Sequence, residues 1–126
     1  MSDRFLNVQK ALYTRLTSAL TPVPVYDYVP QDEAPPFVVI GEDTALPADT
    51  KTYNGVEHSL QVHIYSDKRG LSEVKGYMAT IYDDLQRAPL TVSGYNTSTP
   101  LFDFSDSFIE PEGSRGVIRF RVRTTE

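Results

Sequence analysis

This 126-residue chain has two histidines, and histidine is the side chain that most often binds a transition metal or moves a proton near neutral pH. His58 and His63 lie in one alternating segment at positions of opposite parity. Their rings therefore face opposite sides of a strand and cannot share a metal. The sequence has no cysteine and contains no GxSxG, HExxH, P-loop or GxGxxG motif. We therefore expect no catalytic residue, no metal site and no cofactor.

Three arginines alternate with apolar residues near the end of the chain: Arg119, Arg121 and Arg123. The alternation places the three guanidinium groups on one face of a strand, where like charges repel unless they are paired or screened. Three interpretations stay open. The row could pair with Asp103 and neighbouring acids on an adjacent strand, or with an acidic segment such as Asp32 and Glu33 across a subunit interface. It could also contact DNA phosphates.

A strand followed by a helix, over residues 56–85, is expected to organise the fold around these groups. Apolar residues at even positions predict one buried face of a strand: Val56, Leu60, Val62 and Ile64. Spacings of three or four then predict one stripe of a helix: Leu71, Val74, Met78, Ile81 and Leu85.

A second helix and several strands complete the prediction. The first helix is capped by Ser2, ends before Pro22, and has its stripe at Phe5, Val8, Leu12, Leu16 and Ala19. We expect further strands at residues 25–29, 37–40, 90–95, 101–109 and 116–123, the last two forming a hairpin. The polar residues 44–54 read as a long excursion between strands. The predicted class is α+β: one antiparallel-rich sheet of five or six strands, with two amphipathic helices packed on one face.

The bulk properties bound the function as well as the fold. The length fits a single domain over residues 1–126. The net charge of −5 argues against an open surface that wraps nucleic acid, for which a basic face is expected. No apolar run approaches the roughly 20 residues that cross a bilayer, and the first residues do not resemble a signal peptide.

Three segments carry a resemblance to a known family. They are VYDYVPQDEAPPFVVIGED at residues 25–43, HSLQVHIYSDKRGLSEVKGYMATIYDDL at residues 58–85, and the closing GVIRFRVRT at residues 116–124. Together with the first amphipathic helix, they resemble the tail-completion, or tail-terminator, proteins of long-tailed bacteriophages, prophages and gene transfer agents. Residues 44–54 and 94–100 carry little of this resemblance.

The resemblance implies a structural virion protein and no reaction. Such a subunit forms a homo-oligomeric ring, usually a hexamer, at the junction of tail and neck, and is made in the cytoplasm of the bacterial host. The ring sits on the last disc of the tail-tube protein, ends tube polymerisation and joins the tail to the head-neck connector protein. Six copies would carry six times −5, about −30, and an acidic lumen would repel DNA that passes through it.

Two stretches are expected to make the contacts between subunits or with the tube. The first is the excursion at residues 44–54, with Asp49, Lys51 and Tyr53. The second is the arginine row at residues 119–123, paired across a subunit interface with an acidic segment such as residues 32–33.

Three other functions remain open at this point. A neck or head-completion adaptor also forms a ring of small subunits and would bind a connector on the portal side. A small hydrolase or transferase would depend on His58 or His63. A DNA-binding module would bind with an affinity that falls steeply with salt.

Overall fold

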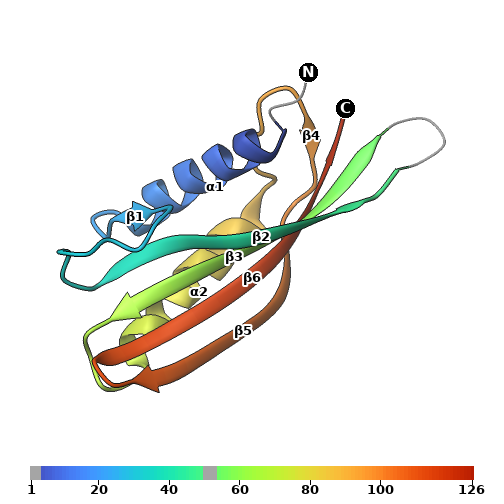
Figure 1. Cartoon of the computed structure of the whole chain (residues 1–126). Helices are drawn as coiled ribbons and strands as arrows, with labels where there is room; N and C mark the ends of the chain where they lie inside the picture. Colours follow the sequence, from blue (N-terminus) through green and yellow to red (C-terminus); the bar gives the residue numbers. More distant parts are fainter. Residues whose placement is uncertain (1–3, 50–53) are drawn as a thin grey trace.

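The computed structural model describes residues 4–49 and 54–126 of the chain (Figure 1). It contains two helices, α1 (Arg4–Leu20) and α2 (Ser72–Arg87). The strands are β1 (Val25–Tyr26), β2 (Phe37–Pro47), β3 (Gly55–Ser66), β4 (Asn96–Thr97), β5 (Leu101–Glu110) and β6 (Gly113–Thr125). The predicted α+β class with two helices is confirmed, whereas the capping role predicted for Ser2 lies outside the described residues.

The strands form one six-stranded sheet in the order β1-β2-β3-β6-β4, with β5 paired beside β4 along the same side of β6. The sheet is mixed, because β1 runs parallel to β2 while the other pairings are antiparallel. β5 and β6 form the predicted hairpin around the turn that precedes Gly113. Figure 1 shows the long strands curving around the helices.

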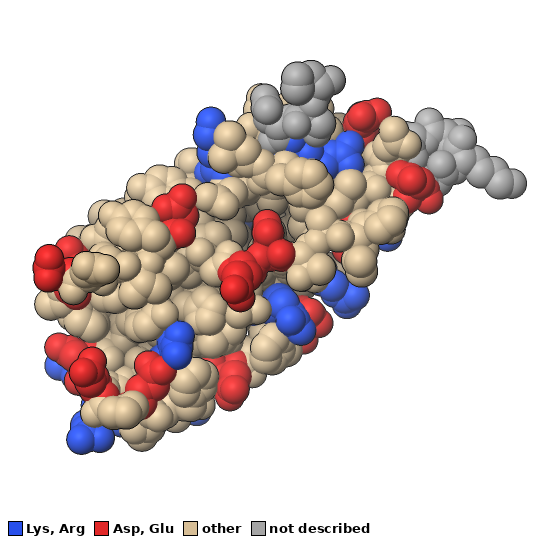
Figure 2. Space-filling model, in the orientation of Figure 1, with Lys and Arg blue, Asp and Glu red and all other residues tan. Residues whose placement is uncertain are grey.

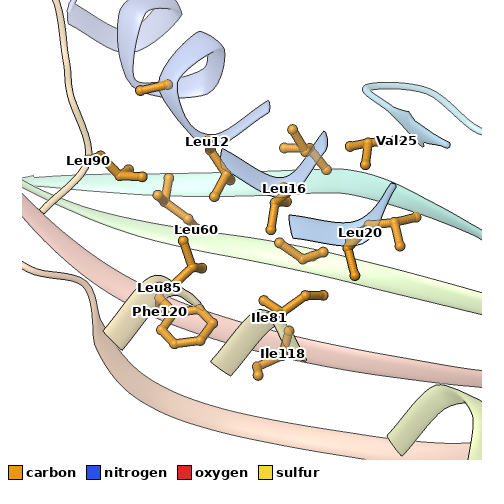
Figure 3. Close-up of a cluster of buried hydrophobic side chains, with 14 of the residues drawn as sticks. Leu12, Leu16, Leu20, Val25, Leu60, Ile81, Leu85, Leu90, Ile118 and Phe120 are labelled. Atoms are coloured by element: carbon orange, nitrogen blue, oxygen red, sulfur yellow. The ribbon is translucent and has the colours of Figure 1, made fainter. Parts of the chain in front are cut away.

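Both helices pack on one face of the sheet, as predicted. Leu12 and Leu16 of α1 and Ile81 and Leu85 of α2 join the inward residues of β3 and β6 in one buried cluster, in which Leu60 is central (Figure 3). The even positions predicted for β3 supply Leu60, Val62 and Ile64 to this cluster. Burial of this apolar surface is the main force that holds the helices on the sheet.

Arg15 ties the two helices together through a set of charge-assisted hydrogen bonds. Its Nε donates to Asp84 Oδ2 over 3.0 Å. Its Nη1 donates to the carbonyl oxygens of Ala88 at 3.2 Å and Pro89 at 3.0 Å, just beyond the end of α2. Its Nη2 donates to the Asp84 carbonyl oxygen in the last turn of α2, one of the carbonyls that a helix end leaves without partners.

Phe5 is the one clear error in the predicted stripe of α1, since it is 57% exposed. The inward position of that turn is taken instead by Arg4, whose guanidinium stacks over the Tyr95 ring at 4.6 Å and pairs with Glu126 at 3.7 Å. Ala19 is half-buried, and Leu20 ends the helix in the core.

β2 is much longer than the predicted strand at residues 37–40. All four residues of that run are buried, and Phe37 stacks on Tyr65 on the sheet face that the helices leave open. After a register shift between Ile40 and Asp43, β2 continues to Pro47, paired with β3. The prediction of an excursion beginning at residue 44 is therefore wrong. Residues 41–47 are polar or exposed, and backbone hydrogen bonds to β3, rather than burial, hold them in the sheet.

Two short strands were misplaced by the sequence. The strand predicted at residues 25–29 covers Val25–Tyr26 only. Residues 90–95 form no strand: Leu90 and Val92 are buried in an irregular segment, and β4 follows at Asn96–Thr97. Burial of isolated apolar residues in a loop produces the same sequence pattern as a short strand.

Candidate assembly surfaces

The two histidines lie on opposite faces of the sheet, as their parity predicts. His58 is completely buried, hydrogen-bonded through Nε2 to Thr124 Oγ1 at 3.0 Å, and burial lowers its pKa. His63 is half-buried on the other face, where Gln61 Nε2 donates to its Nε2 over 3.0 Å. The described residues contain no group of three or more side chains that could hold a metal ion. These contacts give both rings a packing role.

Arg119 is occupied within its own chain. Its Nε donates to Asp103 Oδ2 over 2.9 Å, and its guanidinium lies over the Phe104 ring at 4.4 Å. Asp103 belongs to β5, the neighbour of β6, so for Arg119 the pairing expected with the adjacent strand is present.

Arg121 and Arg123 are exposed on the same face of β6, opposite Ser59 and Glu57 of β3. Neither guanidinium forms an ion pair with any residue that the structure describes. The two arginines therefore present positive charge that is available to another molecule.

Asp32 and Glu33 are exposed in the segment between β1 and β2, at the opposite end of the sheet. The register places Arg123 opposite Glu57, whereas Phe37, which follows this segment, lies opposite Tyr65. The eight residue-to-residue steps from position 57 to position 65 of β3 span about 26 Å. Within one chain, the structure therefore does not bring the acidic pair near the arginines.

At one end of the sheet, β2 and β3 continue as an arm made of residues 44–49 and 54–58, beside which β6 pairs with β3 as far as Gly55 (Figure 1). Asp49 helps to close the arm, because its Oδ1 accepts the Gly55 N–H at 2.9 Å while Ala48 N–H donates to the Gly55 carbonyl at 2.9 Å. The predicted contact residues Lys51 and Tyr53 lie outside the described residues. Leu46 on this arm is 58% exposed.

The exposure of the predicted strand β5 is the feature that sequence analysis missed. None of its ten residues is buried, and four of the large exposed apolar side chains of the molecule lie on it: Leu101, Phe102, Phe104 and Ile109. A register shift between Phe102 and Phe104 reverses the alternation that the sequence predicts. Phe102 lies opposite Phe120 on the helix side, whereas Phe104 lies opposite Arg119 on the other face. After the shift Ser105 and Ser107 occupy the inward positions, and the alternation of the sequence does not signal this change.

A groove between α2 and β5 results from this reversal. It is lined by Lys75, Met78, Ala79, Tyr82, Phe102, Ser105, Asp106, Ser107 and Ile118. Ser105 and Ser107 face the helix side opposite Ile118 and Gly116, and their small side chains leave the groove unfilled. Tyr82 and Phe102 meet edge to face at 5.3 Å at its end, with exposed fractions of 42% and 41%.

Charges are interspersed on the face of the molecule seen in Figure 2, where acidic and basic groups alternate and no large field of one sign forms. Wide uncharged areas separate them. A surface of this kind suits contacts between proteins better than a phosphate backbone.

Comparison with known proteins decides the family. A family model described as tail completion protein gp17 matches residues 10–125, almost the whole chain. The chain belongs to this family. A tail completion protein is a structural protein of the phage tail, so its place is in the virion. None of the described helices of this tail completion protein is long and apolar enough to span a membrane.

Two solved structures share the fold of this tail completion protein. A chain in the virion of a native gene transfer agent particle is 24% identical, with a TM-score of 0.83, over 99% of this chain and 100% of that one. The bacteriophage SPP1 gp17 protein is 21% identical, with a TM-score of 0.56, over 98% of this chain and 93% of its own. A search of curated protein sequences finds no match.

Proposed function

We propose that this tail completion protein forms a closed ring of six copies that caps the last disc of the tail tube. The ring ends tube polymerisation and offers its other face to the head-neck connector at the tail-neck junction, and DNA passes only through its lumen. The role is mechanical, with no reaction and no cofactor. The family supports a role in the tail, and the exposed apolar strand β5 is the main observation in favour of a ring.

β5 supports assembly because every one of its ten residues is exposed or only half-buried in a lone subunit. Natural proteins blunt edge strands with lysine, proline or a covering element. β5 has a bulge and three acidic residues but neither lysine nor proline, and its Phe102 N–H donates to Gln86 Oε1 at 3.0 Å. A large apolar strand left open in this way is typical of a surface that a partner covers.

The two ends of the sheet support different partners. In a ring whose subunits join through their lateral edges, all subunits stand at the same height. Groups about 26 Å apart along a strand then lie toward opposite faces of the ring. The arm, with its predicted contact residue Asp49, and the nearby Arg121 and Arg123 of β6 form one interface, and the predicted contacts Lys51 and Tyr53 are assigned to the same interface. The exposed Asp32 and Glu33 belong to the other. A terminator must match the tube on one side only, and unlike ends provide that difference.

A polymerisation assay tests this function. Purified tube protein is allowed to assemble with and without the tail completion protein, and tube lengths are measured by electron microscopy. We expect tubes that carry a ring at one end and stop growing there. If tubes elongate past the added protein and a pull-down recovers only a portal-side connector, the protein is a neck adaptor and not a terminator.

The two ends can be tested separately. Replacing residues 46–55 by a short turn, or reversing the charges of Arg121 and Arg123, should abolish binding to one partner and leave the ring intact. Reversing Arg119 is avoided, because it would break the internal pair with Asp103. Loss of the ring on reversal of Arg121 and Arg123, with rescue by Asp32→Lys and Glu33→Lys, would show instead that these charges pair between subunits.

A further inference from the structure

β1 and β5 form opposite lateral edges of the sheet, since among the described strands each pairs with one neighbour only (Figure 1). The register places both edges at the same level along the strands. Val25 of β1 lies opposite Val38 of β2, which lies opposite Ile64 of β3. Ile64 lies opposite Gly116 of β6, which lies opposite Ser107 of β5. In a ring whose subunits join through these edges, β1 of one copy therefore meets β5 of the next.

The two edges also run in the directions that antiparallel pairing needs. β1 is parallel to β2, and three antiparallel pairings then lead from β2 through β3 and β6 to β5. β1 and β5 therefore run in opposite directions. Rotation about a ring axis that runs along the strands keeps these directions, so the two edges meet in antiparallel orientation. The sheet of one copy can then continue into the next through backbone hydrogen bonds.

The two side chains that follow β1 lie on different faces of the sheet. Asp27 lies on the helix face, where its Oδ2 accepts a hydrogen bond from Gln9 Nε2 of α1 at 3.2 Å. Tyr28 lies on the open face, where its ring is 5.5 Å from that of Tyr26, and Tyr26 contacts Phe37 at 6.0 Å. Asp27 is exposed, and Tyr28 is 60% exposed. The β1 edge therefore offers a carboxylate on one face and an aromatic ring on the other.

β5 places suitable residues at the same levels and on the same faces. Counted from the shared level, antiparallel orientation brings Asp27 to Ser105 and Tyr28 to Phe104 of the next copy. Ser105 faces the helices, in the groove between α2 and β5. Phe104 lies on the open face, where it is 38% exposed. Each side chain of the β1 edge thus meets the face of β5 on which it can pack.

Lys75 gives the groove a charge that suits Asp27. Lys75 is exposed on α2 and lines the groove, and it forms no ion pair with any residue that the structure describes. The side chain of Asp106, the other charged residue of the lining, lies on the open face, because Ser105 and Ser107 on either side of it face the helices. Asp27 likewise has no ion pair within the described chain. A carboxylate at one edge and an ammonium group at the other are therefore left to pair between copies.

We propose that the β1 edge of one copy docks along β5 of the next. Asp27 enters the groove between α2 and β5 and pairs with Lys75 of the neighbouring copy. Tyr28 packs on Phe104 of that copy, on the open face of the sheet. The contact rests on the proposed ring and specifies which surfaces close it, and it covers the strand that a lone subunit leaves exposed.

Disulfide trapping tests the contact directly, because the chain contains no cysteine of its own. A Tyr28→Cys/Phe104→Cys variant is assembled on tail tubes, oxidised and separated on a denaturing gel. Within one copy the two edges are about 19 Å apart along the sheet, so the disulfide can form only between copies. We expect a ladder that extends beyond the dimer, whereas either single cysteine variant can reach the dimer at most.

A second cysteine pair tests the register of the contact. In Tyr28→Cys/Ser105→Cys the cysteine on β5 moves by one residue and faces the helices, away from position 28. Cross-linking of this control pair should be at least about ten-fold weaker. Equal cross-linking of the two pairs would overturn the proposed register.

Charge exchange provides an independent test. Asp27→Lys and Lys75→Asp alone should each weaken ring assembly about ten-fold, because each brings like charges together, and the two changes together should restore it. Lys10→Asp is the matched control, because Lys10 is exposed on α1 outside the groove, and ring assembly should be unchanged.

The outcomes separate this contact from the proposed function. Rings that cap tubes normally but give no ladder, together with double charge variants that are no better than the single ones, would overturn the contact and leave the terminator role standing. Absence of rings for the unaltered protein would overturn both.

Discussion

β3 and β5 are neighbours of the same strand and yet have opposite environments. Each pairs antiparallel with β6, over twelve and nine register positions respectively. β3 alternates buried and half-buried residues along its length, whereas β5 has no buried residue. The helices cover β3 and leave β5 open. The comparison shows that hydrogen bonding to β6 is enough to hold a strand in this sheet, whereas the burial of its side chains depends on whether a helix covers it.

The sharpest test of this comparison removes one phenylalanine from each environment. Phe120 is 1% exposed at the centre of the core, and Phe104 is 38% exposed on β5. We expect Phe120→Ala to lower the free energy of unfolding by about 3–5 kcal/mol, because it opens a cavity among packed side chains. Phe104→Ala, the matched control, should cost less than about 1 kcal/mol. Urea denaturation measures both, and equal losses would show that β5 is part of the core.

The helix layer can be weakened without touching the sheet. Arg15→Ala removes the hydrogen bonds to Asp84 and to the carbonyls after α2, and we expect a loss of about 2 kcal/mol. Lys10→Ala on the same helix should change the stability of the monomer by less than about 0.5 kcal/mol. Equal stability of Arg15→Ala and Lys10→Ala would show that the hydrogen bonds of Arg15 do not stabilise the packing of the two helices.

The Arg15→Ala variant should also change how the stability of the fold depends on pH. Burial opposes the charge of Asp84, but hydrogen bonds from Arg87 and Arg15 outweigh it and lower its pKa below the usual value. A carboxyl whose pKa is lower in the folded state stabilises the fold above its unfolded pKa of about 3.9, and this contribution is lost as the pH falls through the folded pKa. Arg15→Ala should therefore lose less stability than the unaltered protein on acidification below pH 4.

The histidines of β3 give a second pH effect that β5 cannot produce. Burial lowers the pKa of His58, and burial with the Arg115 charge lowers that of His63. Below about pH 6.5 the unfolded chain binds protons that the folded chain does not, so stability falls as the pH drops. A His58→Gln/His63→Gln variant should show a flatter stability profile between pH 7.5 and 5.5. A profile as steep as that of the unaltered protein would assign the effect to other groups.

The smallest expected effect lies in α2, the helix that forms one wall of the open groove. Gly76 is exposed in mid-helix, and apart from its chain neighbours and the nearby helix backbone no atom lies within 4 Å of the position that a β-carbon would take. Glycine costs about 0.5–1 kcal/mol relative to alanine there, so Gly76→Ala should stabilise the fold by that amount. A loss of stability on thermal denaturation would mean that the backbone at Gly76 is closely packed.

The parts of the fold with a complete period were predictable from sequence. The middle of each predicted stripe is buried as expected, because each repeats an apolar residue often enough to define one face. Val56 and Leu71, at the starts of the two stripes, are only half-buried. The polar end of β2 has no such period, since both of its faces are exposed on the arm, and the sequence alone could not show that pairing continues to Pro47.

The candidate surfaces were less accessible to sequence reasoning. The alternation of Phe102, Phe104 and Phe108 indicates one apolar face, but a single bulge moves the later two residues to the other side. A bulge depends on the partner strand and leaves no mark in the alternation itself. The arginine row was visible, and its partial pairing with Asp103 followed from a neighbouring strand. The sequence analysis did not single out the exposed apolar residues Leu6 and Tyr13 of α1, because they lie outside the buried stripe of that helix.

The most direct test of the account is the length of the tails in particles whose gene for this chain has been deleted. If the protein is a passive ring that ends the tube, electron micrographs should show headless tails with tubes of irregular and excessive length. Expression of the unaltered chain in trans should restore one uniform length. Tails of normal length joined to heads in the deletion mutant would contradict the account.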